Sequence, residues 1–216
     1  MVINLKVPDK IILMLSGGLD SAILLYCICK YYPQTIIVTA TGKNIHVPYD
    51  AEKAKDILSF IENEFPENNI IKNCEYDLDP KNKEWLEKAK DWKNTRFHSH
   101  QSLSQHMQQV HELEKIKLDM QIYDFMNGTT ANPPVEIDGG MPARVGKDLP
   151  EVIETSKNVR MHLPWANKDK KYIAKIYKDE GLMQSLFKLT RSCIGTNLNE
   201  CGKCFWCLEK HWGFQL

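Results

Sequence analysis

The sequence predicts an α/β fold with an open, mostly parallel sheet and helices on both faces. The apolar run Ile11 to Leu15 has the length of a buried strand, and Ser21 to Tyr32 is long enough for about three helical turns. Thr35 to Ala40 reads as a second buried strand, so the three segments form a strand–helix–strand unit with parallel strands and a right-handed crossover. The length of 216 residues favours a single domain, residues 1–216.

The loop between the first strand and the first helix has the sequence SGGLDS, residues 16–21. Paired glycines let the backbone turn sharply and approach a ligand closely, and the N–H groups that begin a helix favour negative charge. The loop has neither the lysine of G-x-x-x-x-G-K-[ST] nor the third glycine of G-x-G-x-x-G. A turn capped by Asp20 or Ser21 is the alternative, but a cap does not require two glycines and two serines. We therefore expect a phosphate-binding loop.

The remaining elements follow from shorter patterns. Residues 41–43 are expected to leave the second strand, and Pro48 introduces a helix with one apolar stripe. Ile70 to Tyr76 is a third candidate strand, and a further helix carries Ile173, Ile176 and Tyr177 and stops at Gly181. A breaker-rich loop, residues 132–140, lies where it could cover a substrate.

Residues 77–126 form a strongly polar segment that we interpret as a mainly helical, solvated insert, with a loop near residues 94–99. It contains His98, His100, His106 and His111. The last two are five positions apart and do not share a helical face, and no cysteine or carboxylate completes a ligand set, so we do not predict a metal site there.

Composition limits the class of protein. Lys+Arg and Asp+Glu both number 28, and this neutral balance argues against a nucleic-acid partner. No apolar stretch approaches the length of a membrane span, and the first ten residues lack a signal peptide's apolar core, so no membrane partner and a cytoplasmic location are expected. Seven cysteines in such a chain favour metal ligands or buried thiols over disulfides, and Cys27 and Cys29 are expected to fill the core.

Four cysteines near the C-terminus have metal-ligand spacing. Cys193, Cys201, Cys204 and Cys207 follow the pattern C-x7-C-x2-C-x2-C, and Gly202 allows a tight turn between sulfurs. An all-sulfur set of this kind is typical of a tetrahedral, structural Zn2+ site, and an iron–sulfur cluster is the alternative. Residues 190–216 would then be a zinc-binding segment that fastens the chain end to the core, with Trp206, Trp212 and Phe214 packed on it.

Both ends of the chain resemble one known family. SGGLDS resembles the loop of the ATP pyrophosphatases, which split ATP between the α- and β-phosphates. Together with Thr190 to Cys193 and CGKCFWC, it resembles 7-cyano-7-deazaguanine synthase, the nitrile-forming enzyme of queuosine-precursor synthesis. Leu163-Pro164 with Lys168 and Ile173 loosely resembles the family's P-L…K…I stretch, with the first two residues reversed. The middle departs: Gly42-Lys43 replaces Gly-Gln, and the Tyr-Pro-Asp-Cys substrate motif is missing.

The resemblance implies an adenine-nucleotide α-hydrolase-like (Rossmann-like) fold of N-type and a ligase that uses ATP, Mg2+ and Zn2+. It implies that a substrate carboxylate, a deazapurine-like acid, becomes an acyl adenylate and reacts with ammonia. Asp20 and Ser21 would be catalytic. The implied nucleotide contacts are Leu15, Ser16, Gly17, Gly18, Leu19, Asp20, Ser21, Ala40 and Lys168.

Two other functions stay open. One is a related ATP pyrophosphatase that modifies a tRNA base, a protein or a nucleotide, and the other is a non-catalytic ATP-binding partner protein. The sequence also leaves open which acid is activated and whether the chain forms a homodimer.

Overall fold

The computed structural model describes residues 3–45, 49–90, 100–138, 150–154, 158–193, 195 and 199–216. Several features predicted from the sequence lie outside these ranges: Pro48 before the second helix, the loop at residues 94–99 with His98, and the end of the breaker-rich loop, Gly139 and Gly140. The elements, in chain order, are β1 (Lys10–Met14), α1 (Leu19–Tyr31), β2 (Ile36–Asn44), α2 (Tyr49–Glu64), β3 (Ile70–Leu78), α3 (Lys83–Lys90), α4 (His100–Met120), β4 (Asp124–Met126), α5 (Val135–Asp138), β5 (Val152–Glu154), β6 (Arg160–His162), α6 (Lys170–Asp179), the 3-10 helix η2 (Leu182–Gln184), α7 (Leu186–Leu189) and α8 (Phe205–Phe214).

The predicted α/β architecture is confirmed. Among the described residues, six strands form one sheet in the order β3-β2-β1-β4-β6-β5, and of these only β5 runs antiparallel to its neighbour. β2 and β4 lie on opposite sides of β1, so the chain changes direction across the sheet at β1. In open α/β sheets ligands bind beyond the carboxyl ends of the strands at such a switch point. The SGGLDS loop leaves β1 there.

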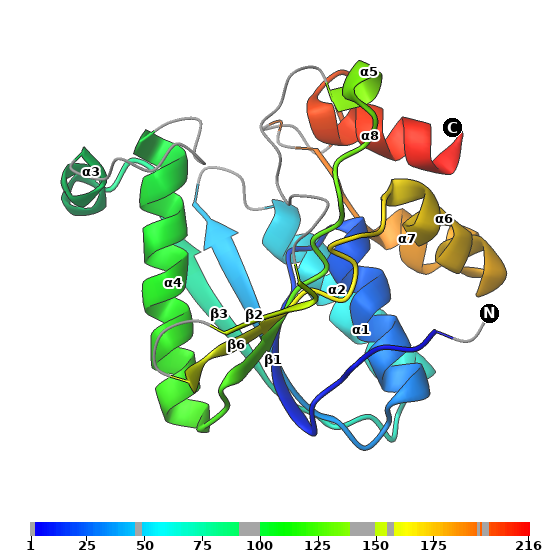
Figure 1. Ribbon diagram of the computed structural model, residues 1–216, viewed down its shortest axis with the longest axis horizontal. Coiled ribbons are helices and arrows are strands. Elements are labelled where there is room, and N and C mark those ends of the chain that lie inside the picture. The colour runs from blue at the N-terminus through cyan, green and yellow to red at the C-terminus, as the bar shows by residue number, and fades with distance from the viewer. Residues whose placement is uncertain are drawn as a thin grey trace.

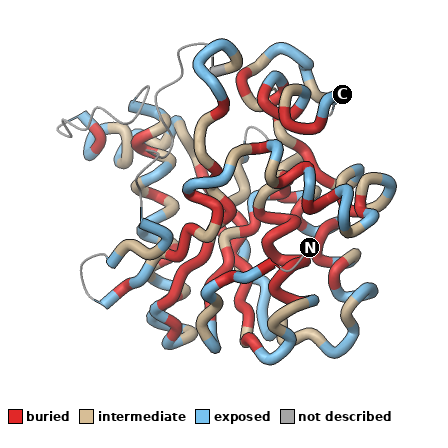
Figure 2. Tube along the Cα trace, turned by 45° about the vertical axis from the view of Figure 1, so that its right-hand side comes forward, coloured by how far each residue is buried: buried red, intermediate tan, exposed pale blue. Residues whose placement is uncertain are grey.

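Helices cover both faces of the sheet (Figure 1). Ile11 and Leu13 of β1 pack with α1, α2 and α6 on one face, whereas Ile12 packs with α4 on the other. This alternation follows from the two-residue period of a strand. Buried positions therefore run through the centre of the sheet and along α1, as Figure 2 shows. Cys27 and Cys29 are buried in this core, as expected.

Two segments differ from the sequence-based expectation. β2 does not end at Ala40 but continues to Asn44, because β3 pairs with it in parallel along this extension. Helix α4 is not a solvated insert over its whole length. Its second half places Leu113, Ile116 and Met120 against the sheet, where they close the core on that face. The segment is polar overall, but a helix needs only one apolar stripe to pack against a sheet, and α4 has one.

No helix in the part of the chain that the structure describes is long and apolar enough to span a bilayer.

Candidate functional site

The SGGLDS loop turns directly from β1 into α1. Gly17 has a φ of +76°, and a Cβ there would lie 2.1 Å from the carbonyl oxygen of Asp50, so this position requires glycine. Gly18 is the N-cap of α1 and supplies no capping side chain. The first-turn N–H groups of a helix have no intrahelical acceptor. With neither Asp20 nor Ser21 acting as the cap, these groups can bind an anion.

Hydroxyl groups hold the loop in shape. The Ser16 N–H donates to Ser21 Oγ at 3.2 Å, the Ser16 and Ser21 hydroxyl oxygens lie 3.1 Å apart, and the Ser21 hydroxyl donates to the Gly18 carbonyl at 3.3 Å. Ser21 is buried. From the neighbouring strand end, a Cβ at Gly128 would lie 2.7 Å from the Asp20 carbonyl, so the chain after β4 passes close to the loop.

Two cavities meet at this loop. The larger has a volume of about 550 Å³, and the smaller about 190 Å³. Ser16, Asp20, Asp50 and Trp206 line both of them. A volume of several hundred Å³ is typical of small-molecule sites. The strand ends and the loop thus face one continuous region in which a ligand could contact both cavities.

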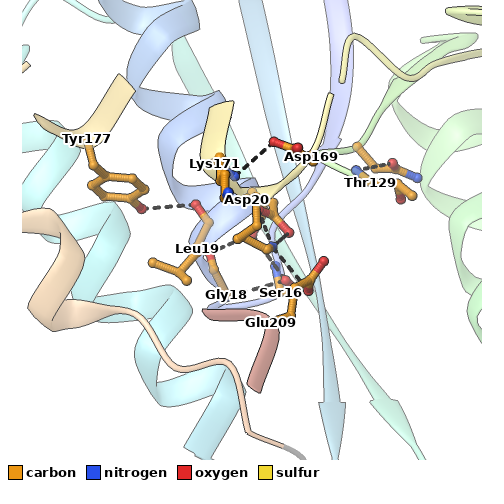
Figure 3. Close-up of polar contacts among 12 residues, drawn as sticks. Ser16, Gly18, Leu19, Asp20, Thr129, Asp169, Lys171, Tyr177 and Glu209 are labelled. Atoms are coloured by element: carbon orange, nitrogen blue, oxygen red, sulfur yellow. Dashed lines mark hydrogen bonds and ion pairs between the residues drawn. The ribbon is translucent and has the colours of Figure 1, made fainter. Parts of the chain in front are cut away.

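The two cations of the site line the smaller cavity, together with three carboxylates. Lys170 lines it, and its Nζ donates to the two carboxylate oxygens of Asp20 at 2.7 and 2.5 Å (Figure 3 shows Asp20 in this group of contacts). Arg191 lines it too and donates from Nη1 to Asp50 Oδ1 at 2.8 Å. Burial raises the pKa of Asp50, and the bond from Arg191 opposes that rise. Each cation therefore has a carboxylate partner that lines both cavities.

The larger cavity has a different lining. β2 and β3 contribute Ala40, Gly42, Tyr76 and Leu78, and a stripe of α4 contributes Ser102, Gln105, His106 and Gln109. Burial lowers the pKa of the His106 imidazole, so the ring is mainly neutral at pH 7. Apart from the two aspartates that it shares with the small cavity, this lining offers neutral hydrogen-bonding groups. It suits a polar, uncharged ring system.

The residues predicted to contact the nucleotide lie together around the two cavities, except Gly17 and Lys168. The loop residues and Ala40 line one or both cavities, except Gly17, whose place is fixed against Asp50. Lys168 lines neither cavity: it is exposed, and its amino group lies 5.4 Å from the centre of the Tyr172 ring. The lysine at the loop is Lys170. It is the first residue of α6, and it shares the buried helix face with Ile173, Ala174 and Tyr177.

That shared face is the signal by which Lys170 could have been found. Positions 170, 173, 174 and 177 are three or four apart, the spacing of one helix face. A lysine in line with core residues cannot point to open solvent. Arg191 has no comparable signal in the sequence. It lies outside the helices and strands, and its carboxylate partner Asp50 is 141 positions away.

The four cysteines converge as predicted. Their Sγ atoms all lie within 4.8 Å of one another, and they are the one such group of possible ligands among the described residues. Gly202 has a φ of +68°, the left-handed conformation expected of the turn between Cys201 and Cys204. Backbone N–H groups donate to the sulfurs, from Cys201 to Cys193 Sγ at 3.3 Å and from Cys204 to Cys201 Sγ at 3.3 Å. The cluster could form a zinc knuckle.

The aromatic residues expected to pack on the knuckle have separate places. Phe214 is buried in the main core with Tyr177 and Phe187. Trp206 lines both cavities, and Trp212 lies under the amino group of Lys171 at 4.7 Å. Helix α8 therefore packs on α6 and the core, and these three aromatic side chains face the core, α6 and the cavities rather than the cysteine cluster.

A cavity of about 630 Å³ lies at the other end of the sheet, near the start of β1. Asp124 accepts a hydrogen bond from Arg160 there, and it lies 2.7 Å from Nε2 of His162. It contains no strand-to-helix loop and lies away from the carboxyl ends of the parallel strands. The site at SGGLDS is the better candidate.

No family model matches the chain, and no curated protein sequence matches it. Among solved structures, the NMN synthetase from Francisella tularensis is similar with a TM-score of 0.55 and 12% identity, over 94% of this chain and 76% of that one. The U34-tRNA thiolase NcsA from Methanococcus maripaludis, solved with its 4Fe–4S cluster, has a TM-score of 0.49 and 11% identity, over 94% of this chain. The chain spans 64% of the thiolase's length.

The NH3-dependent NAD synthetase from Campylobacter jejuni has a TM-score of 0.48 and 14% identity, over 83% of this chain and 67% of that one. At such identities the likeness concerns the fold. The sheet order, the helices on both faces and the similarity to the NMN synthetase define the adenine-nucleotide α-hydrolase fold.

Proposed function

We propose that this protein is an ATP-dependent enzyme that adenylates a substrate carboxylate, in the manner of a 7-cyano-7-deazaguanine synthase. One observation carries the proposal: the SGGLDS helix start, which has no side-chain cap, faces a small cavity where Lys170 and Arg191 are each paired with a carboxylate, and this cavity shares part of its lining with a larger, polar cavity. The negative phosphates of ATP match the first cavity, and the uncharged adenosine and a polar ring match the second.

The chain's residues would contribute mainly by position and charge. The substrate carboxylate forms a bond to the α-phosphorus, the bond from that phosphorus to the bridging oxygen breaks, and pyrophosphate leaves with the electron pair. The loop N–H groups, Lys170 and Arg191 would stabilise the charge that develops on pyrophosphate. Ammonia would then displace AMP from the acyl adenylate, giving an amide. A second ATP would adenylate the amide oxygen with loss of pyrophosphate, and this oxygen would leave with AMP as the amide nitrogen loses its protons, giving the nitrile.

Mg2+ fits the acidic groups at this site. Asp20 and Asp50 line both cavities, and Mg2+ is usually held by one or two carboxylates together with substrate phosphates. These two residues would hold the ion, which would neutralise charge on the phosphates. Ser16 and Ser21 bond each other and shape the loop around it.

The experiment is product analysis. Purified protein, ATP and Mg2+ are incubated with 7-carboxy-7-deazaguanine and ammonium, and the expected products are AMP, pyrophosphate and a nitrile identified by its mass. Formation of ADP and phosphate would contradict the proposal. AMP formation that requires added RNA or protein would favour another acceptor on the same ATP chemistry.

We also propose that the cysteine cluster binds one structural zinc ion. A zinc ion with sulfurs at about 2.3 Å places them about 3.8 Å apart. The Sγ atom of Cys204 lies 4.0 Å from that of Cys193 and 3.4 Å from that of Cys207, and Cys201 Sγ lies 4.0 Å from Cys207 Sγ. An iron–sulfur cluster puts several atoms between its cysteines and needs wider spacing.

Metal analysis of the purified protein should give about one zinc per chain. Cys204→Ser should lose the metal and reduce the soluble yield, because metal binding by such a knuckle contributes to folding. A variant that stays folded with no metal, or a wild-type protein that contains iron and sulfide, would contradict this assignment.

A further inference from the structure

Lys170 is surrounded by two carboxylates from different parts of the chain. Its side chain is 4% exposed. Asp20 of α1 accepts hydrogen bonds from Nζ, and Glu209 Oε2 of α8 lies 3.7 Å from the same nitrogen, with a side chain that is 1% exposed. A buried ammonium group is costly unless it is paired. Figure 3 shows Glu209 and Asp20 in one group of polar contacts beside Ser16.

Helix α8 also guides the lysine by its shape. A Cβ at Gly213 would lie 2.5 Å from Lys170 Cγ and 2.7 Å from its Cβ. The absence of a side chain at Gly213 therefore lets the stem of Lys170 pass against α8. Glu209 and Gly213 are four residues apart, so they lie on the same face of α8 and act on the same side chain.

The cysteine cluster fixes this face relative to the loop. α8 begins directly after Cys204 and contains Cys207, two positions before Glu209. The segment before the cluster contacts the loop independently, since the Arg191 N–H donates to the Gly17 carbonyl at 3.0 Å. The C-terminal segment is thus a wall of the candidate site as well as a knuckle.

The two carboxylates differ in their access to the larger cavity. Asp20 lines both cavities, whereas Glu209 lines only the smaller one. A Mg2+ ion that arrives with ATP would draw Asp20 away from Lys170. We propose that Glu209 is a positioning residue that holds the ammonium group of Lys170 beside the loop when Asp20 turns to Mg2+. This inference rests on the proposed function and extends it to a residue outside the SGGLDS motif.

The test is the Mg2+ requirement of nucleotide binding in the full chain. Calorimetry measures the affinity for α,β-methylene-ATP, which cannot be split at the α,β-position, over a series of Mg2+ concentrations and in EDTA. In Glu209→Gln, Lys170 keeps only Asp20 of the two carboxylates, so Mg2+ must compete harder for Asp20. We expect the half-saturating Mg2+ concentration to rise about tenfold. Affinity in EDTA should not fall, because removing a negative charge does not repel the phosphates.

Glu180→Gln is the matched control. Glu180 is also a well-buried carboxylate paired with a lysine, but it lies at the far end of α6 and lines neither cavity at the loop. It should bind nucleotide with the wild-type Mg2+ requirement. Metal content and thermal unfolding of each variant show whether the fold is retained.

A comparison in the Lys170→Met background covers the case in which Glu209→Gln alone folds poorly. In Lys170→Met, which removes the ammonium group, a further Glu209→Gln change should leave the Mg2+ requirement unaltered. An equal loss of affinity with and without Mg2+, or an unchanged requirement in Glu209→Gln, overturns the inference and leaves the proposed function standing. A wild-type protein that takes up no nucleotide at any Mg2+ concentration overturns both.

Discussion

Two lysine–carboxylate pairs join α1 to α6, one at each end of these helices. At the loop, Lys170 of α6 pairs with Asp20 of α1, and at the far end Lys30 of α1 pairs with Glu180, the residue that caps α6. The chemistry is the same, but the exposure is reversed. Lys170 is 4% exposed and its carboxylate 22%, whereas Lys30 is 38% exposed and its carboxylate 6%.

This reversal separates a pair suited to a ligand from a pair suited to packing. At the far end, water can solvate the lysine, while Glu180 is fixed by the Tyr31 hydroxyl, which donates to Oε1 at 2.5 Å. At the loop the lysine is buried and the carboxylate faces the cavities, so a cation that binds Asp20 changes the partner of Lys170. Neither Lys30 nor Glu180 lines the cavities at the loop. Which group faces the ligand space, rather than the strength of the pair, distinguishes the two roles.

The largest expected effect comes from breaking the pair at the loop. Asp20→Asn should reduce the rate of AMP release at least about a hundredfold, because it removes the carboxylate proposed for Mg2+. The variant should stay folded, because asparagine keeps the size of the side chain, but its free energy of unfolding should fall by up to about 3 kcal/mol, because the buried Lys170 loses a charged partner. The measurement is AMP formation together with a denaturant unfolding curve, and wild-type AMP release by the variant would remove Asp20 from the mechanism.

A smaller effect, on stability alone, is expected from breaking the far pair. Burial alone would raise the pKa of Glu180, but hydrogen bonds from Lys30 and Tyr31 outweigh it and lower that pKa below 4.5. Glu180→Gln should reduce the free energy of unfolding by about 1–2 kcal/mol at pH 7, less than for a fully buried pair because Lys30 reaches solvent. Nucleotide binding should remain as in the wild type.

The pH dependence of that loss has a definite sign. A carboxylate whose pKa is lower in the folded state stabilises the fold above its unfolded pKa, and the contribution disappears as pH falls through the folded value. The difference between wild type and Glu180→Gln should therefore shrink below about pH 4.5. A difference that stays constant from pH 7 to pH 3 would show that the variant acts through packing rather than charge.

Local patterns of the sequence were enough for the parts that are local in space. The β1–loop–α1 unit is contiguous, so its apolar runs and paired glycines predict its local fold. The cysteines lie within fifteen positions, and their spacing predicts their convergence. The family resemblance implies Lys168, but this residue lines neither cavity, and the lysine at the loop is Lys170, because the start of α6 decides which lysine faces the core.

The sequence by itself determined the α/β class, the strand–loop–helix turn at SGGLDS and the convergence of the four sulfurs, since each depends on neighbouring residues and on elementary backbone geometry. Only the tertiary structure decided that α4 forms a wall of the larger cavity, that Arg191 contacts the loop, and that Asp20 and Glu209 share Lys170. The contacts of Arg191 and Lys170 join residues 39 to 174 positions apart, and which of many polar residues meet there depends on how the helices pack on the sheet.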